Sequence, residues 1–279
     1  MKITGFSKNK EFFKFHESDF VDYEKIYEVL TGKLAGCIFR KAISAEKCSI
    51  IAKNFWHYKE LESRSDGVPG FFLGTYHYKK ALSQYISESI IANKSLSNLF
   101  SGTLNVFEDI ITKFSDALKK KSNSPIIRPA QYGGVQACKF FMRAWKGSGE
   151  YSLAPHDDSA QCTAKIQKGF EIQEVINNPV VAINMCIENE GDGKLHYWDI
   201  QPDIETKKRL GLEETGYPYP TELLADFDKI ELDINAGDIY FFNGKNVHAV
   251  SSPKGQDSYR TTIAGLMGFK DKKTIIYWT

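Results

Sequence analysis

The most informative part of the sequence is Ile234-Asn-Ala-Gly-Asp-Ile-Tyr-Phe-Phe-Asn-Gly-Lys-Asn-Val-His248, because it joins two turn signals to an aromatic strand and ends at a histidine. The pair Gly237-Asp238 predicts a tight turn. The aromatic run from Ile239 to Phe242 then leads to Asn243-Gly244, a strong hairpin signal. We therefore expect a second, short strand after this hairpin, and we expect it to carry His248.

Further short apolar runs lie on both sides of this stretch, and Gly, Asp, Asn and Pro bound them. The runs are 138–145, 179–187, 194–199, 230–234, 238–243, 260–269 and 274–278. No helical pattern alternates with them, so they predict an antiparallel sandwich or barrel rather than a parallel sheet. A polar insert at 200–229 interrupts the series. It is too long for a hairpin turn and could be a lid, a binding loop or a passive surface excursion.

The first 130 residues follow a different pattern, because their apolar residues recur near the helical period of about 3.6. We predict helices from Ser44 through Phe55, over 82–90, and from Leu104 to Leu118. The stretch 119–129, with lysines and prolines, is a connector. The expected architecture is α+β and mainly β, in a single domain over 1–279. Helices of residues 1–130 would pack outside a β core of residues 131–279.

The composition is that of a globular protein, since 279 residues with 42% hydrophobic content can fill a core. The 36 Lys and Arg balance 35 Asp and Glu, which argues against nucleic-acid and acidic membrane partners. No stretch approaches the roughly 20 apolar residues of a membrane span. The five cysteines contain no CxxC pair and are expected to be reduced thiols. We expect a cytoplasmic protein.

His156 and Asp158 stand two residues apart, so on an extended strand both side chains would project from one face. Asp157 would face the opposite side. Alone, such a pair is more often a pair of surface polar residues than a metal site. Together with His248 it would form a set of two histidines and one carboxylate, which leaves three positions open on a non-haem Fe(II) ion.

At these residues the sequence resembles the Fe(II)- and 2-oxoglutarate-dependent oxygenases, whose pattern is HxD, a long gap, a distal His and an Arg about ten residues later. The match consists of 156–158, His248 and Arg260. The 92 residues between the histidines are long for the family, and the insert 200–229 accommodates them. More closely, the chain is similar to the small-molecule branch that contains the alkaloid halogenase WelO and the hydroxylases of N-substituted amino acids. This similarity includes the turn at 191–195.

The resemblance implies a double-stranded β-helix, the jelly-roll fold of the cupins, with His156, Asp158 and His248 as ligands of Fe(II). It implies 2-oxoglutarate as cosubstrate and O2 as oxidant, with Arg260 holding the distal carboxylate. A guanidinium offers a bidentate fork that matches a carboxylate, and Thr262 on the same strand face could add a hydroxyl donor. The alternative for the arginine is a surface salt bridge.

The resemblance also implies the reaction, which is hydroxylation of an aliphatic C–H of a small molecule with succinate and CO2 as coproducts. The substrate class would be a free or N-modified amino acid or a natural-product intermediate. Halogenases of the branch have Gly or Ala in place of the carboxylate, so Asp158 disfavours halogenation. Desaturation and cyclisation would use the same residues. A cupin-like binding protein without turnover, and an oxygenase acting on a protein, are the other classes.

Substrate contacts are predicted from strand alternation, which places Arg143 on one face with its aromatic neighbours. If that face is inward, the guanidinium needs an anionic partner from the protein or from a ligand. The glycine-rich loop 66–72, which contains Phe71, could border the pocket. Trp198 is a further candidate, although core packing is the more common fate of such a residue. His77 has no suitably spaced carboxylate and is expected to pack or to be exposed.

Overall fold

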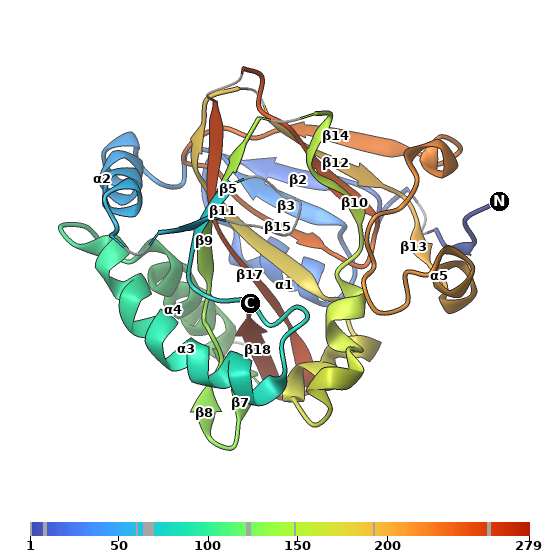
Figure 1. Ribbon diagram of the computed structural model, residues 1–279, viewed down its shortest axis with the longest axis horizontal. Helices are drawn as coiled ribbons and strands as arrows, with labels where there is room; N and C mark the ends of the chain where they lie inside the picture. The colour runs from blue at the N-terminus through green and yellow to red at the C-terminus, as the bar shows by residue number, and fades with distance from the viewer. Residues whose placement is uncertain are drawn as a thin grey trace.

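The computed structural model describes residues 2–7, 10–59, 61–63, 70–120, 124–147, 149–191, 193–255 and 258–279. Most of its strands belong to two sheets (Figure 1). The larger sheet contains β2 (Phe15–Ser18), β3 (Gly36–Phe39), β4 (Glu62–Ser63), β5 (Gly70–Leu73), β6 (Ile126–Pro129), β9 (Phe141–Lys146), β11 (Val181–Asn189), β15 (Ile239–Asn243), β17 (Tyr259–Asp271) and β18 (Thr274–Trp278). The smaller sheet contains β10 (Tyr151–His156), β12 (Lys194–Trp198), β14 (Lys229–Asp233) and β16 (His248–Ser251).

The remaining elements are short pairs of strands and helices. Strand β1 (Gly5–Phe6) pairs with β13 (Gln201–Pro202), and β7 (Gln131–Tyr132) pairs with β8 (Val135–Gln136). The α-helices are α1 (Tyr23–Leu30), α2 (Ala45–Trp56), α3 (Leu82–Leu96), α4 (Val106–Lys119) and α5 (Ile204–Leu210). The 3-10 helices are η1 (Ser97–Phe100), η2 (Ser159–Cys162), η3 (Lys165–Gln167), η4 (Glu171–Asn177) and η5 (Thr221–Leu224).

Strands β11 and β17 form the centre of the larger sheet. They pair antiparallel, and β17 continues the sheet to β9 while β11 continues it to β15. Both strands are apolar over most of their length, because helices or the opposite sheet bury each face. All seven strands predicted after residue 131 are present, and their ends differ from the prediction by at most three residues.

The three predicted helices are confirmed as α2, α3 and α4. Ser44 is the N-cap of α2, and its hydroxyl accepts a hydrogen bond from the Lys47 N–H. Asn105 caps α4 in the same way through the Glu108 N–H. Helix α1 was not predicted, although Asp22 caps it and it packs its buried face against β3 and β15.

The N-terminal part is less separate than its helical pattern predicts. It contributes β2, β3, β5 and β6 to the larger sheet, where β3 pairs with β15 and β5 pairs with β9. The segment of β3 is a short, fully buried run without the alternation that marks a half-exposed strand, so periodicity could not identify it. One apolar cluster contains residues from both halves of the chain.

The predicted hairpin at Asn243-Gly244 is wrong, because β15 and β16 belong to different sheets. The turn instead carries the chain from the larger sheet to the smaller one. Neither residue has the positive φ that a two-residue type I′ hairpin turn requires. The Gly244 N–H donates to the Val180 carbonyl, and its own carbonyl accepts from the Asp158 N–H at 2.8 Å. The turn thus ends beside the HxD segment.

Side chains of the two sheets meet between them. The ring of Phe242 from β15 lies 4.7 Å from the ring of His248 from β16 and 5.9 Å from that of Tyr197 from β12. Trp145 from β9 and Val250 from β16 form a further contact across the gap. The space between the sheets is therefore lined by residues far apart in the sequence, and it contains the predicted site.

The insert 200–229 covers the outer face of the smaller sheet. Its apolar residues form a second buried cluster with residues of β12 and β16 and with the N-terminal Ile3. Helix α5 begins at the N-cap Asp203 and ends at Gly211, whose φ of +69° belongs to the left-handed region that favours glycine. The insert is therefore a packed layer on the sheet.

All five cysteines are buried free thiols. Within the described ranges, no helix combines the length and the apolar character that a bilayer crossing requires.

Candidate metal centre

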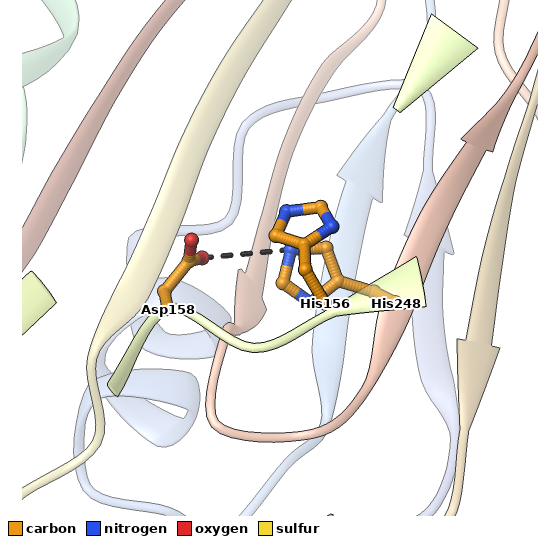
Figure 2. A group of neighbouring side chains, drawn as sticks. All are labelled: His156, Asp158 and His248. Carbon is orange, nitrogen blue, oxygen red and sulfur yellow. Dashed lines mark ion pairs between the residues drawn. The ribbon is translucent and has the colours of Figure 1, made fainter. Parts of the chain in front are cut away.

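Two histidines face each other where β10 ends and β16 begins. His156 and His248 are register partners in the antiparallel pair of these strands, so their side chains lie on the same face. Their ring centroids are 4.1 Å apart. Figure 2 shows the two rings beside each other, with Asp158 approaching from the segment that follows β10.

Asp158 completes the group. Its Oδ2 lies 3.5 Å from His248 Nε2, and one possible ligand atom from each of the three residues falls within 4.8 Å of the others (Figure 2). The sequence predicted this convergence through strand alternation, and that reason is wrong. Strand β10 ends at His156, and Asp158 has helical backbone angles as the N-cap of η2. The turn after the strand therefore brings the carboxylate back to the histidines.

The ring orientations fit metal binding through Nε2. His156 Nδ1 lies 2.9 Å from the Ala154 carbonyl oxygen, and His248 Nδ1 lies 2.9 Å from the Asn246 carbonyl oxygen. Each Nδ1–H donates to a backbone carbonyl, which leaves Nε2 with its lone pair. Two imidazole nitrogens and one carboxylate oxygen form the facial set that suits non-haem Fe(II). The residues present therefore fit this ion.

Burial sets the charge state of the three ligands. It lowers the pKa of His156 to about 3, with a further contribution from the nearby His248. It also lowers the pKa of His248 to about 4. The same desolvation raises the pKa of Asp158 to about 6. At pH 7 the group therefore offers two neutral imidazoles and one carboxylate, which are the protonation states that metal binding needs.

Arg260 on β17 is fully buried, so the alternative of a surface salt bridge is excluded. Its Nη2 donates to the Tyr240 hydroxyl at 2.8 Å, and its Nη1 donates to the carbonyl oxygens of Gly193 and Lys194 at 3.3 and 3.4 Å. These acceptors are all uncharged. A buried guanidinium with such partners attracts an anionic ligand. Thr262 lies two residues further along the strand, and its buried hydroxyl has no hydrogen-bond partner among the described residues.

Arg143 on β9 lies beside Thr262, its register partner on β17. Its guanidinium carbon lies 4.1 Å from the ring centre of Trp145 and 5.0 Å from that of Phe141. These aromatic rings hold the cation on the same face as the arginine and threonine of β17. Burial is the main cause of the lowered pKa of His248, and the positive charge of Arg143 adds to it. The predicted grouping of Arg143 with its aromatic neighbours is confirmed.

Phe71 is not brought to this group. On β5 it is the register partner of Ala144, the neighbour of Arg143 in sequence, so it projects from the opposite face of the sheet. Its ring packs against Trp56 and Tyr259 at centroid distances of 5.7 and 6.4 Å. Residues 66–69 of the predicted loop lie outside the described residues, as does position 192 of the predicted turn.

Trp198 is also placed elsewhere. Its neighbour Tyr197 is the register partner of His248 and shares its face, so Trp198 projects from the other face of the smaller sheet. There it is buried with Val247 and Ala249 beneath the insert. The two aromatic substrate contacts predicted at 71 and 198 are therefore corrected, because the alternation within each strand turns them away from the triad.

Known proteins resemble this chain over most of its length. Residues 9–279 match the family model described as carrier-protein-independent halogenase WelO5. The chain belongs to the WelO5 family. It is also 32% identical over 250 residues to the L-isoleucine 3(1)-dioxygenase of Pantoea ananatis (strain AJ13355). The aligned region covers 87% of this chain and 82% of that protein. The resemblance to Fe(II)- and 2-oxoglutarate-dependent oxygenases is thereby confirmed.

The solved structures that resemble this WelO5 family member show the same fold at low sequence identity. The N-substituted L-amino acid dioxygenase from Burkholderia ambifaria AMMD is 18% identical, with a TM-score of 0.59 over 92% of this chain and 91% of that one. The same enzyme in complex with α-ketoglutarate is 17% identical, with a TM-score of 0.58 over 91% and 90%. At these identities the comparison supports the fold alone.

One buried network of this WelO5 family member was not predicted. The Asp157 carboxylate accepts hydrogen bonds from Lys207 Nζ at 2.7 Å and from the Tyr219 hydroxyl at 2.8 Å, and it also contacts the Ser159 hydroxyl. Lys207 and Tyr219 both come from the insert 200–229. Asp157 thus faces away from the triad, as alternation predicted, and ties the HxD segment to the insert. Nothing local in the sequence signals partners 50 and 62 residues away.

The sequence also gave no sign of two hydrogen bonds made by predicted site residues. Gln161 donates a hydrogen bond to Asp158, and Tyr240 accepts one from Arg260. His77, which was expected to pack or to be exposed, is buried against Gln161. The contacts of Arg260 with Tyr240 and of His77 with Gln161 join separate elements, whereas Asp158 and Gln161 are three residues apart.

Proposed function

We propose that the chain is an Fe(II)- and 2-oxoglutarate-dependent dioxygenase that hydroxylates an aliphatic C–H of a free amino acid, with succinate and CO2 as coproducts. The observation that carries this proposal is the convergence of His156, Asp158 and His248 in the space between the two sheets. The family match and the relative named L-isoleucine 3(1)-dioxygenase support the reaction and the substrate class.

The two facing sheets are proposed to be the double-stranded β-helix of this superfamily. The likeness to the Burkholderia dioxygenase fold supports this assignment. So does the position of the triad, because both of its histidines come from the smaller sheet and His248 packs against Phe242 of the larger one. Residues 1–279 would then form one oxygenase domain, with the N-terminal helices outside the larger sheet.

His156, Asp158 and His248 would hold Fe(II), which when bound supplies the oxidising chemistry with O2 and 2-oxoglutarate. Arg260 would hold the distal carboxylate of 2-oxoglutarate through its buried guanidinium, and the Thr262 hydroxyl would donate to the same group. Support comes from the burial of both side chains and from the uncharged partners of the arginine. Asp158 occupies the position that halogenases leave to a halide, so hydroxylation is favoured over halogenation.

Arg143 is proposed to bind the α-carboxylate of the amino acid. Its guanidinium is held over two aromatic rings, its charge acts on the ligand histidines, and it lies beside Thr262 on the face that lines the site. A cation at this position would orient the aliphatic side chain of a free amino acid relative to the triad. A free amino acid is favoured over an N-modified one because the relative with 32% identity is named for L-isoleucine.

The test measures 2-oxoglutarate binding and turnover separately. Anaerobic addition of Fe(II) and 2-oxoglutarate to metal-free protein should produce the weak visible charge-transfer band of the chelate. The band should be lost in His248→Ala and weakened in Arg260→Ala, whereas the exposed Arg209→Ala should leave it unchanged. Absence of the band in folded wild-type protein would overturn the oxygenase assignment and favour a cupin-like binding protein.

Succinate formation is then measured with free aliphatic amino acids and with their N-succinyl derivatives. Substrate-dependent succinate with the free amino acids, together with a product 16 Da heavier, is the expected result for one inserted oxygen atom. Arg143→Met should raise the KM for the amino acid while leaving the anaerobic band intact. Stimulation by the N-succinyl compounds alone would overturn the substrate class.

A further inference from the structure

A row of polar side chains extends from Asp158 into the core on the side away from the histidines. Gln161 Nε2 donates to Asp158 Oδ1 at 2.8 Å, whereas the other carboxylate oxygen, Oδ2, faces His248 Nε2 at 3.5 Å. The two oxygens therefore have different environments. One is occupied by an amide, and the other faces the position that a metal would take.

The row continues through a buried imidazole. His77 Nε2 lies 3.1 Å from Gln161 Oε1, and His77 Nδ1 lies 2.7 Å from Gln167 Oε1. The ring donates to one amide or the other according to its tautomer. Gln167 Nε2 donates in turn to the carbonyl oxygens of His77 and Lys80, at 2.6 and 3.2 Å. The row thus ends on backbone, which fixes the orientation of its last amide.

The row is anchored in the fold. His77 and Gln167 are each 1% exposed. The His77 N–H donates to the carbonyl of Thr279, and its ring lies 5.9 Å from that of Tyr85 on α3. Because the His77 ring is fixed by Gln161, Gln167 and Tyr85, it cannot follow a displaced carboxylate. The row therefore resists rotation of the Asp158 side chain.

We propose that Gln161 and His77 are positioning residues that make Asp158 bind the metal through Oδ2 alone. This inference rests on the proposed function. A facial triad leaves three of six positions open, and 2-oxoglutarate needs two of them while O2 needs one. A carboxylate that bound through both oxygens would take one of these positions. The amide of Gln161 occupies Oδ1 and thereby preserves the open set.

The test uses Co(II), whose binding and visible spectrum report the ligand geometry without turnover. Gln161→Met keeps the length of the side chain and removes the amide, and His77→Phe keeps a ring without its nitrogens. We expect Co(II) affinity to fall about 10- to 100-fold in each variant, the range typical of outer-shell partners of metal ligands. The visible absorption bands should also change shape. Because the two residues act in one row, their effects should not add. The double variant should bind Co(II) about as weakly as the weaker of the two single variants.

Gln173→Met is the matched control. Gln173 lies in the neighbouring 3-10 segment η4, and among the described residues its side chain forms hydrogen bonds with Gly169 and Ala164 alone. Its loss should therefore change neither the affinity nor the spectrum. Gln161 is partly exposed, so its variant should fold even if the buried His77→Phe does not. Wild-type affinity and spectrum in folded Gln161→Met would overturn the inference. Failure of the wild-type protein to bind Co(II) would instead overturn the proposed function.

Discussion

Gly244 lies so close to Asp158 that a Cβ atom added to the glycine would stand 2.2 Å from Asp158 Oδ2 and 3.0 Å from Asp158 Cβ. The two residues are also joined by the hydrogen bond from the Asp158 N–H to the Gly244 carbonyl. The glycine is therefore required by close approach, since its own φ is not in the left-handed region. The turn that links the two sheets sets the place of the Asp158 carboxylate.

Gly244→Ala should weaken metal binding at least tenfold, because the methyl group must displace the carboxylate or the turn. The measurement is Co(II) titration of the metal-free protein. Gly265→Ala in β17 is the control, since a Cβ there would meet its nearest atom at 3.3 Å and lies away from the triad. Equal affinities of Gly244→Ala and wild type would show that the close approach is not needed to place Asp158.

Lys207→Met should lower the free energy of unfolding by about 3–5 kcal/mol, because it leaves the fully buried Asp157 carboxylate without its cation. Lys208→Met, at the exposed neighbouring position, should stay within about 0.5 kcal/mol of wild type. Urea unfolding of both variants measures the difference. The Asp157→Asn/Lys207→Met double variant should lose less than the sum of the single changes. Equal effects of Lys207→Met and Lys208→Met would show that the insert is not held by this ion pair.

The features that the sequence predicted are those with a local signal or a known spacing. The pattern of HxD, a distal histidine and a later arginine predicted that His156, Asp158 and His248 form one group. It also predicted Arg260 as a carboxylate-binding residue, and its burial is a finding of the structure. The strands of the second half were also predicted, because their apolar runs end at turn residues. These signals are local, or they belong to a pattern that can be read along the chain.

The rest depends on contacts between distant segments. Strand β3 and the sheet crossing at Asn243-Gly244 depend on which strands become neighbours, which turn residues alone do not determine. Phe71 was a candidate because its glycine-rich loop could border the pocket, and Trp198 because it lies on a predicted strand of the barrel. Each projects from the face opposite to the site. The Gln161 and His77 row joins residues 84 positions apart, and no spacing rule connects them.

Glu171→Gln should lose stability in a pH-dependent way. Burial raises the pKa of Glu171, but the hydrogen bonds from Arg128, Lys270 and the Gln131 N–H outweigh it, so the pKa lies below its usual value. A depressed carboxyl pKa contributes stability that is complete above the unfolded value of about 4.3 and is lost as the pH falls through the folded value.

The gap in unfolding free energy between wild type and Glu171→Gln should therefore be largest near pH 7 and should shrink below about pH 4. Urea unfolding at pH 7, 5 and 3 measures it. Glu174→Gln is the control, because the Glu174 side chain is 55% exposed and reaches Lys270 only at 3.4 Å. A gap that stays constant from pH 7 to pH 3 would contradict a role for the ionised carboxylate.

Tyr240→Phe tests how the guanidinium of Arg260 is held. The hydroxyl of Tyr240 is the closest described acceptor of this arginine, and both side chains are buried, so water cannot easily replace the lost partner. A guanidinium that is less firmly oriented should bind the distal carboxylate of 2-oxoglutarate less well. Hydrogen bonds to charged groups contribute about 1.5–3 kcal/mol, so we expect the KM for 2-oxoglutarate to rise about tenfold or more.

The KM for the amino acid should show no such change, because the Tyr240 hydroxyl accepts its hydrogen bond from Arg260. Tyr277→Phe on β18 is the control for loss of a buried hydroxyl. Initial rates measured while one substrate is varied at saturating concentrations of the other separate the two KM values. An equal rise in both would mean that Tyr240 supports the whole space between the sheets, whereas an unchanged KM for 2-oxoglutarate would show that the backbone carbonyls of Gly193 and Lys194 suffice to orient the arginine.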